Sequence, residues 1–265
     1  MNTVGNLETT FGADSTPVTI NYRYDNPDGL GTPMVYVHGW GCSQRDFEGA
    51  AIHPALENRP RLSFDMPGHG ESSSYSGDIS IGNITSILHD VASTAGIGHF
   101  AIVGHSVGGL VAITYAREHQ DRIAGLVNIV GNMEPEDCFL TGDVADGRTT
   151  RKSLIERFRG SDNPGFRRYA EGLARVDNHA YIALAAAAVE ACADGAAYDD
   201  FIELNLPKLF MYGSEAAGTM SYLDELRDSS DIRVHEVPGA DHFPAVDNPA
   251  SFYGALGSFM ERLDR

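Results

Sequence analysis

Cysteine is scarce in this sequence, and the three cysteines present, Cys42, Cys138 and Cys192, are widely spaced. Three such residues do not form a disulfide framework, and their spacing is not that of a zinc site. No apolar run is long enough to span a membrane, because the most apolar stretch, residues 180–197, contains two acidic residues. The first residues lack the basic start and apolar core of a signal peptide. We therefore expect a cytoplasmic protein that uses no metal ion and no cofactor.

Basic residues are also few. The chain has 19 lysines and arginines against 37 aspartates and glutamates, which gives a formal net charge of −18. Nucleic acids and anionic membrane surfaces repel so acidic a protein, so neither is an expected partner. With 265 residues, 42% of them hydrophobic, the chain can bury one large core, and one domain with an insertion is the natural expectation. The oligomeric state is left open.

Short apolar runs alternate with helix-length segments along most of the chain. Residues 18–24 alternate apolar and polar side chains, as in a half-buried antiparallel strand, whereas residues 34–37 are apolar throughout, as in a strand buried on both faces. Strands that alternate with helices predict an α/β fold, with a mostly parallel central sheet and helices on both faces. The other predicted strands are 61–64, 100–103, 125–130, 208–212 and 233–237, and the predicted helices are 47–56, 81–95, 110–119 and 250–263.

The alternation breaks once, between residues 131 and 207, where no convincing strand occurs. A connection of this length is far beyond an ordinary crossover. It contains three helix-like segments, at 151–158, 166–173 and 181–192. We interpret it as a helical cap inserted over the sheet. The predicted organisation is a core of residues 1–132, a cap of residues 133–205 and a second core part of residues 206–265.

The most informative motif is Gly104-His105-Ser106-Val107-Gly108-Gly109, which lies between a predicted strand and a predicted helix. Glycines on either side of the serine permit a turn too tight for side chains, and such a turn pushes the serine hydroxyl beyond the end of the sheet. The pattern G-x-S-x-G in this context indicates a nucleophile elbow. Ser106 is therefore the candidate nucleophile.

Three further motifs make the chain resemble an α/β-hydrolase over nearly its whole length. His38-Gly39-Trp40-Gly41 matches that family's H-G-x-G oxyanion loop, and the segment from Asp65 to Ser72 matches its D-x-P-G-x-G-x-S turn. Gly239 to Pro244 follows the last predicted strand, where the family places its catalytic histidine. The resemblance implies the α/β-hydrolase fold and a serine hydrolase with a helical cap.

The chemistry explains why these parts belong together. A serine hydroxyl is a weak nucleophile until a base takes its proton, and His242 can do so near neutral pH. The tetrahedral intermediate carries an oxyanion that two backbone N–H groups should hold. By resemblance, these groups belong to Trp40 and Val107. Of the ten histidines, only His242 stands in a loop after the final strand.

The family completes a catalytic triad with an acidic residue that orients the histidine. This acid is where the sequence departs from the family's pattern. The family usually places an acid in a G-x-x-D turn after the seventh strand, and here that turn reads Gly213-Ser214-Glu215-Ala216. We favour Glu215, one position early, because this loop is the commoner location. The alternatives, Glu134 and Asp137, lie just beyond the sixth strand, where some relatives carry their carboxylate. A dyad oriented by Asn132 or by a backbone carbonyl is a further alternative.

A serine at the elbow narrows the reaction. Similar haloalkane dehalogenases and epoxide hydrolases use aspartate there, so both are disfavoured. The leading hypothesis is hydrolysis of a carboxylic ester or lactone of a small to medium, mostly apolar substrate. The alternatives are hydrolysis of a C–C bond of the meta-cleavage type, and a non-hydrolytic receptor or lyase on the same fold.

Overall fold

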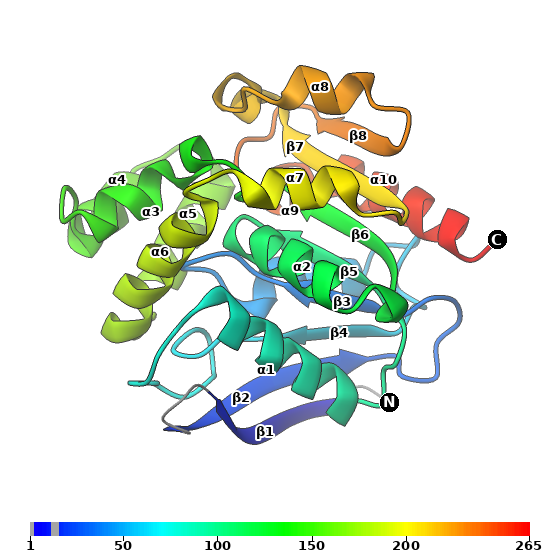
Figure 1. Cartoon of the computed structure of the whole chain (residues 1–265), viewed down its shortest axis with the longest axis horizontal. Coiled ribbons are helices and arrows are strands. Elements are labelled where there is room, and N and C mark those ends of the chain that lie inside the picture. Colours follow the sequence, from blue (N-terminus) through cyan, green and yellow to red (C-terminus); the bar gives the residue numbers. More distant parts are fainter. Residues whose placement is uncertain (1–2, 12–15) are drawn as a thin grey trace.

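The computed structural model describes residues 3–11 and 16–265, which are built around one eight-stranded sheet (Figure 1). The strand order is β1-β2-β4-β3-β5-β6-β7-β8. The segment inspected for a signal peptide includes Met1 and Asn2, which lie outside the described residues. The strands are β1 Thr3–Phe11, β2 Thr16–Asp25, β3 Met34–Val37, β4 Arg61–Phe64, β5 Phe100–His105, β6 Ile123–Ile129, β7 Lys208–Gly213 and β8 Ile232–Val237.

Most of the sheet is parallel, as predicted. β3 pairs in parallel with both β4 and β5, and β6, β7 and β8 continue in the same direction. β2 runs antiparallel to β4, in agreement with its alternating pattern. The sequence pattern did not predict β1, which pairs antiparallel with β2 at the edge of the sheet. β3, β5 and β7 are buried at every position because layers of helices cover both faces.

Helices α1 and α2 cover one face of the sheet, and α10 lies on the opposite face (Figure 1). Ser80 caps α1 and Asn248 caps α10, each accepting a backbone N–H in the first turn. The helix predicted over residues 47–56 is wrong in type and extent, because Gln44–Ala51 forms a 3₁₀ helix, η1, that ends before Pro54. The remaining elements of the core are α1 Ile81–Thr94, α2 Val107–Glu118, η2 Gln120–Arg122, η4 Ser214–Thr219, α8 Leu223–Asp228, α9 Pro244–Asp247 and α10 Pro249–Leu263.

The connection between β6 and β7 contains helices and no strand, as the broken alternation predicted. Helices α3 to α6 gather at one end of the sheet, and α7 returns along it beside α2 (Figure 1). The division into core and cap at residues 132 and 205 stays a prediction. The elements of this connection are η3 Pro135–Cys138, α3 Phe139–Ala145, α4 Arg151–Arg159, α5 Pro164–Leu173, α6 Asn178–Cys192 and α7 Ala196–Glu203.

A search of the described residues finds no single helix that is long and apolar enough to cross a membrane. One bent pair, α6 with α7, meets the length and composition criteria when the two helices are taken together, with a bend of 68°.

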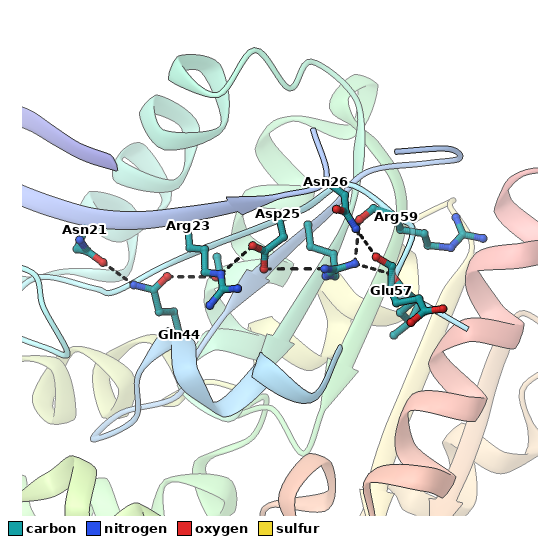
Figure 2. A network of polar contacts seen from close by, with 10 residues as sticks. Asn21, Arg23, Asp25, Asn26, Gln44, Glu57 and Arg59 are labelled. Atoms are coloured by element: carbon teal, nitrogen blue, oxygen red, sulfur yellow. Dashed lines mark hydrogen bonds and ion pairs between the residues drawn. The ribbon is translucent and has the colours of Figure 1, made fainter. Parts of the chain in front are cut away.

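A network of polar contacts joins β2, η1 and β4 beside the sheet (Figure 2). The Gln44 side chain donates to Asn21 at 2.7 Å and to the carboxylate of Asp65 at 2.9 Å, and its backbone N–H donates to the same carboxylate at 2.8 Å. Farther along, Asp25 accepts from Arg23 at 2.8 Å and lies 3.9 Å from Arg61. These contacts fix the start of η1, and therefore the end of the loop that follows β3.

Candidate active site

Ser106 lies at the junction of β5 and α2 with φ 53° and ψ −124°, a strained conformation for a residue with a side chain. The surrounding positions must be glycine, because a side chain there would collide with the backbone. A Cβ on Gly104 would lie 2.2 Å from the carbonyl oxygen of Gly108, and a Cβ on Gly108 would lie 2.3 Å from that of Val37. The turn therefore has the geometry of a nucleophile elbow.

The loop after β3 packs directly on this turn. A Cβ on Gly39 would lie 3.0 Å from the Cβ of Ser106. Two buried histidines hold the loop: His38 Nε2 accepts the backbone N–H of Met66 at 3.0 Å, and His69 Nε2 accepts that of Gly41 at 3.3 Å. Both therefore join the H-G-x-G loop to the turn after β4, which explains why these two motifs occur together.

Trp40 and Val107 carry the two backbone N–H groups expected to hold an oxyanion. Within residues 3–11 and 16–265, neither N–H donates to a protein acceptor. Val107 is the first residue of α2, so the positive end of the helix dipole reinforces its N–H. The Trp40 indole is fixed by α6, where it donates to the carbonyl oxygen of Tyr181 at 2.8 Å and stacks on the Tyr181 ring. The arrangement suits binding of a negative charge beside Ser106.

His242 lies in the loop after β8 and lines the same cavity as Ser106. His105 Nε2 donates to the carbonyl oxygen of His242 at 2.8 Å, and the N–H of His242 donates to Asp241 at 2.8 Å. Burial and the neighbouring His105 lower the pKa of His242 to about 3. Its imidazole is therefore neutral near pH 7, which is the form that can accept a proton.

Asn132, beyond the end of β6, contacts the candidate nucleophile. The Ser106 hydroxyl donates to Asn132 Oδ1 at 3.3 Å. The amide of Asn132 is oriented by its Nδ2, which donates to the carbonyl oxygen of Asp137 at 3.0 Å and to Cys138 Sγ at 3.3 Å. Sequence reasoning considered Asn132 only as a partner of the base, whereas the structure places it on the serine hydroxyl.

The three candidate acids lie in different environments. Glu215 lines the cavity but is exposed, and its backbone N–H is bound to the carbonyl oxygen of Ala240. Glu134 is directed toward Gly195 at the start of α7 and does not line the cavity. Asp137 lines the cavity and is mostly buried, and burial raises the pKa of its carboxyl group. The structure therefore brings Glu215 and Asp137 to the site, but not Glu134.

A small recess of about 30 Å³ lies beside His242. Asp137 and Ala216 both line it, and Ala216 occupies the position where the family's turn carries its acid. Asp137 accepts the N–H groups of Met133 and Glu134 at 2.9 and 3.0 Å and the hydroxyl of Tyr222 at 3.1 Å. A carboxylate is thus held at the recess from the loop after β6, while the turn after β7 places the methyl group of Ala216 there.

The cavity lined by Ser106 and His242 has a volume of about 230 Å³. Aromatic and aliphatic side chains form much of its wall, so it suits a small, mostly apolar compound. Among the described residues, no group of three or more His, Cys, Asp or Glu side chains could hold a metal ion. The apolar part of the wall consists of Trp40, Phe139, Leu140, Phe158, Phe166, Tyr169, Ala216 and Phe243.

We expect the buried histidines to make folding sensitive to mild acid. Burial lowers the pKa of His38 and His105, and lowers that of His69 to about 3. Below pH 6.5 the unfolded chain therefore binds protons that the folded chain does not, so stability is lost as pH falls. Each such histidine contributes up to about 1.4 kcal/mol per pH unit. Urea unfolding at about pH 8 and about pH 5.5 measures the effect, and equal free energies of unfolding would contradict it.

Comparison with known proteins agrees with this geometry. The chain is 28% identical over 255 residues to a pimeloyl-[acyl-carrier protein] methyl ester esterase from Sodalis glossinidius, covering 86% of this chain and 93% of that protein. It is 27% identical over 142 residues to the biotin biosynthesis bifunctional protein BioHC of Teredinibacter turnerae, covering 52% of this chain but only 23% of that protein.

A thermophilic esterase from Thermogutta terrifontis has a similar structure, with a TM-score of 0.79 and 19% identity over 98% of this chain and all of that one. The sequence profile described as "Alpha/beta hydrolase family" matches residues 34–255. This match includes the elbow, the H-G-x-G loop and the loop of His242. The chain belongs to the alpha/beta hydrolase family.

Proposed function

We propose that this hydrolase cleaves a carboxylic ester or lactone of a small to medium, mostly apolar compound through an acyl-enzyme. The observation that carries the proposal is the strained position of Ser106 in a cavity that His242 and Trp40 also line. Relatives named as methyl ester esterases support an ester as substrate. Residues 133–205 then act as a cap that supplies the outer wall of the cavity.

In the proposed reaction, neutral His242 takes the proton of the Ser106 hydroxyl while the oxygen forms a bond to the ester carbonyl carbon. The carbonyl oxygen becomes an oxyanion and accepts the N–H groups of Trp40 and Val107. The intermediate then breaks its bond to the alkoxy oxygen, which leaves with the proton from His242 as the alcohol. Water repeats the sequence on the acyl-enzyme, releasing the carboxylic acid and regenerating Ser106.

The Ser106 hydroxyl has to leave Asn132 before it can reach the base. A hydrogen bond of 3.3 Å to a neutral amide is long and is readily exchanged for one to imidazole. Asn132 then stabilises the resting serine and does not compete strongly with the reaction. The role of Asn132 in this proposal is positioning, not proton transfer.

Asp137 is the best supported acid for orienting His242. It is half-buried and held by three donors, and it lines the same recess of about 30 Å³ as His242. That volume is sufficient for one bridging water molecule. Exposed Glu215 has no such support, since no side-chain partner fixes it within the described part of the chain. The prediction of Glu215 from the loop position remains to be tested beside Asp137.

We expect Asp137→Asn to reduce kcat/KM for an ester by about tenfold or more, and Glu215→Gln to reduce it much less. Tyr222→Phe is the matched control, because it removes a hydrogen bond to Asp137 without removing the charge. If the charge of Asp137 acts across the recess, Ala216→Asp restores part of the activity in the Asp137→Asn background. A larger loss in Glu215→Gln than in Asp137→Asn would assign the role to Glu215.

The proposed function is tested with a fluorophosphonate probe and a short p-nitrophenyl ester. The probe should label Ser106, identified by mass spectrometry of the peptide, and labelling should abolish ester turnover. If Ser106 is not labelled and no ester is hydrolysed, the proposal is wrong. Turnover of a dienone in place of simple esters would instead identify a C–C bond hydrolase.

A further inference from the structure

Basic residues are concentrated in one part of this acidic chain. Residues 148–175, from within the α3–α4 turn to just beyond α5, contain eight of the 19 lysines and arginines but only three of the 37 acidic residues. This segment forms the α4–α5 hairpin of the cap (Figure 1). A local excess of positive charge on a protein with net charge −18 attracts anions to this side of the molecule.

Arg157 is an exposed residue, and it is the basic residue of this segment that lines the cavity of Ser106. Its guanidinium lies over the ring of Phe158, 5.3 Å from the centroid, which restricts its position. In the part of the chain that the structure describes, no carboxylate lies within ion-pair distance of Arg157. Arg168, by contrast, is paired with Asp46 and Glu48 outside the cavity. Arg157 therefore keeps its hydrogen-bonding capacity for another partner.

A continuous aromatic wall leads from Arg157 to the base. Phe158 stacks on Phe166 with centroids 5.0 Å apart, and Phe166 meets Phe243 edge to face at 5.5 Å. Phe243 in turn packs edge to face on His242 at 5.1 Å. A molecule lying along this wall has a cation at one end, apolar surface in the middle and the reacting groups at the other end.

The charges that line the cavity are segregated. The acids, Asp137, Glu215 and Asp241, belong to the loops after β6, β7 and β8 on the sheet side. Arg157 is the one lysine or arginine among the described residues of the lining, and it comes from α4 in the cap. An anionic group is therefore repelled from the sheet side and attracted to the cap side. The ester end then lies at Ser106, and the charged end lies at Arg157.

We propose that the substrate is a half-ester of a dicarboxylic acid, whose free carboxylate binds the guanidinium of Arg157 while its ester lies at Ser106. This inference rests on the proposed function and specifies its substrate class. Guanidinium groups bind carboxylates through two parallel hydrogen bonds, which adds orientation as well as affinity. The aromatic wall contacts the methylene chain between the two ends.

The test compares matched substrates, the monomethyl and dimethyl esters of adipic and suberic acid, which differ only in the charged end. We expect kcat/KM to be about tenfold or more higher for the monoester, and the preference to fall as ionic strength rises. Arg157→Gln should bring the ratio of the two substrates close to one, mainly by raising KM for the monoester. Arg157→Lys, which keeps the charge but loses the planar fork, should keep part of the preference.

Arg159→Gln is the control, because Arg159 is an equally exposed cation of the same helix but does not line the cavity. We expect it to leave the ratio unchanged. If Arg159→Gln lowered the preference for the monoester as much as Arg157→Gln does, a direct contact with Arg157 would be ruled out. The preference would then come from the overall positive charge of the helix. A monoester that is neither a preferred substrate nor an inhibitor of p-nitrophenyl ester hydrolysis would also overturn the inference.

The two proposals fail in different ways. If the dimethyl ester is hydrolysed and Ser106 is labelled, but the monoester has no advantage, the anion site is wrong and ester hydrolysis stands. If Ser106 is not labelled and no ester is hydrolysed, the proposed function itself is wrong.

Discussion

Replacing Ser106 by alanine is expected to lower kcat for an ester by about 10⁴-fold or more, with the fold intact. The substitution removes the only atom proposed to form the covalent bond, whereas the N–H groups of Trp40 and Val107 remain. Those groups alone stabilise the oxyanion of direct attack by water, so a small residual rate is expected above the uncatalysed one. The positive φ of Ser106 is also strained for alanine, so the unfolding midpoint should change little.

The measurement is steady-state turnover of a p-nitrophenyl ester together with fluorophosphonate labelling, both of which should be lost. Ser86→Ala is the matched control, because Ser86 is exposed on α1 and its hydroxyl only donates to the carbonyl oxygen of Gly82. Full turnover in the Ser106→Ala variant would show that Ser106 is not the nucleophile. The aromatic and acidic groups of the cavity would then need another chemical role.

Gly104→Ala is expected to destabilise the protein by about 4 kcal/mol or more, or to prevent its folding. The added methyl would lie 2.2 Å from the carbonyl oxygen of Gly108 and 2.7 Å from the Cα of Gly109. Both atoms belong to the backbone of the buried first turn of α2, which cannot move without displacing Ser106. Loss of stability and loss of activity should therefore occur together.

Urea unfolding monitored by circular dichroism measures this effect. The matched control is Gly82→Ala, at a helical position of α1 where an added methyl would contact nothing within 4 Å. We expect that change to stabilise the protein by about 0.5–1 kcal/mol, because alanine favours helix more than glycine does. A Gly104→Ala protein as stable as the original would refute the close packing of the elbow.

The elbow could be predicted from the sequence because its requirements are local. Gly104 and Gly108 flank Ser106 at fixed spacing, and the strand before and the helix after them have clear apolar patterns. The same holds for the sheet, whose buried parallel strands are short apolar runs. β1 was missed because it is an edge strand, in which Leu7 is the one large apolar side chain turned toward the core within residues 3–10.

The acid could not be assigned in the same way, because its environment depends on distant contacts. Asp137 is held at the recess by the hydroxyl of Tyr222, 85 positions along the chain, and nothing in the local sequence indicates this contact. The bounds of η1 were wrongly predicted for a related reason. Gly49 packs against the ring of Tyr253, and Pro54 stands where the predicted helix would need a backbone donor.

The stacking of Trp40 on Tyr181 has a thermodynamic consequence for the whole enzyme. Tyr181 belongs to α6, and Trp40 is the residue proposed to supply one of the two oxyanion N–H groups. A displacement of α6 that breaks this contact also releases the residue that carries one of the two oxyanion donors. In the proposed mechanism, the position of α6 and the stabilisation of the transition state are then linked equilibria, so we expect a compound that displaces α6 to react slowly even when it reaches Ser106.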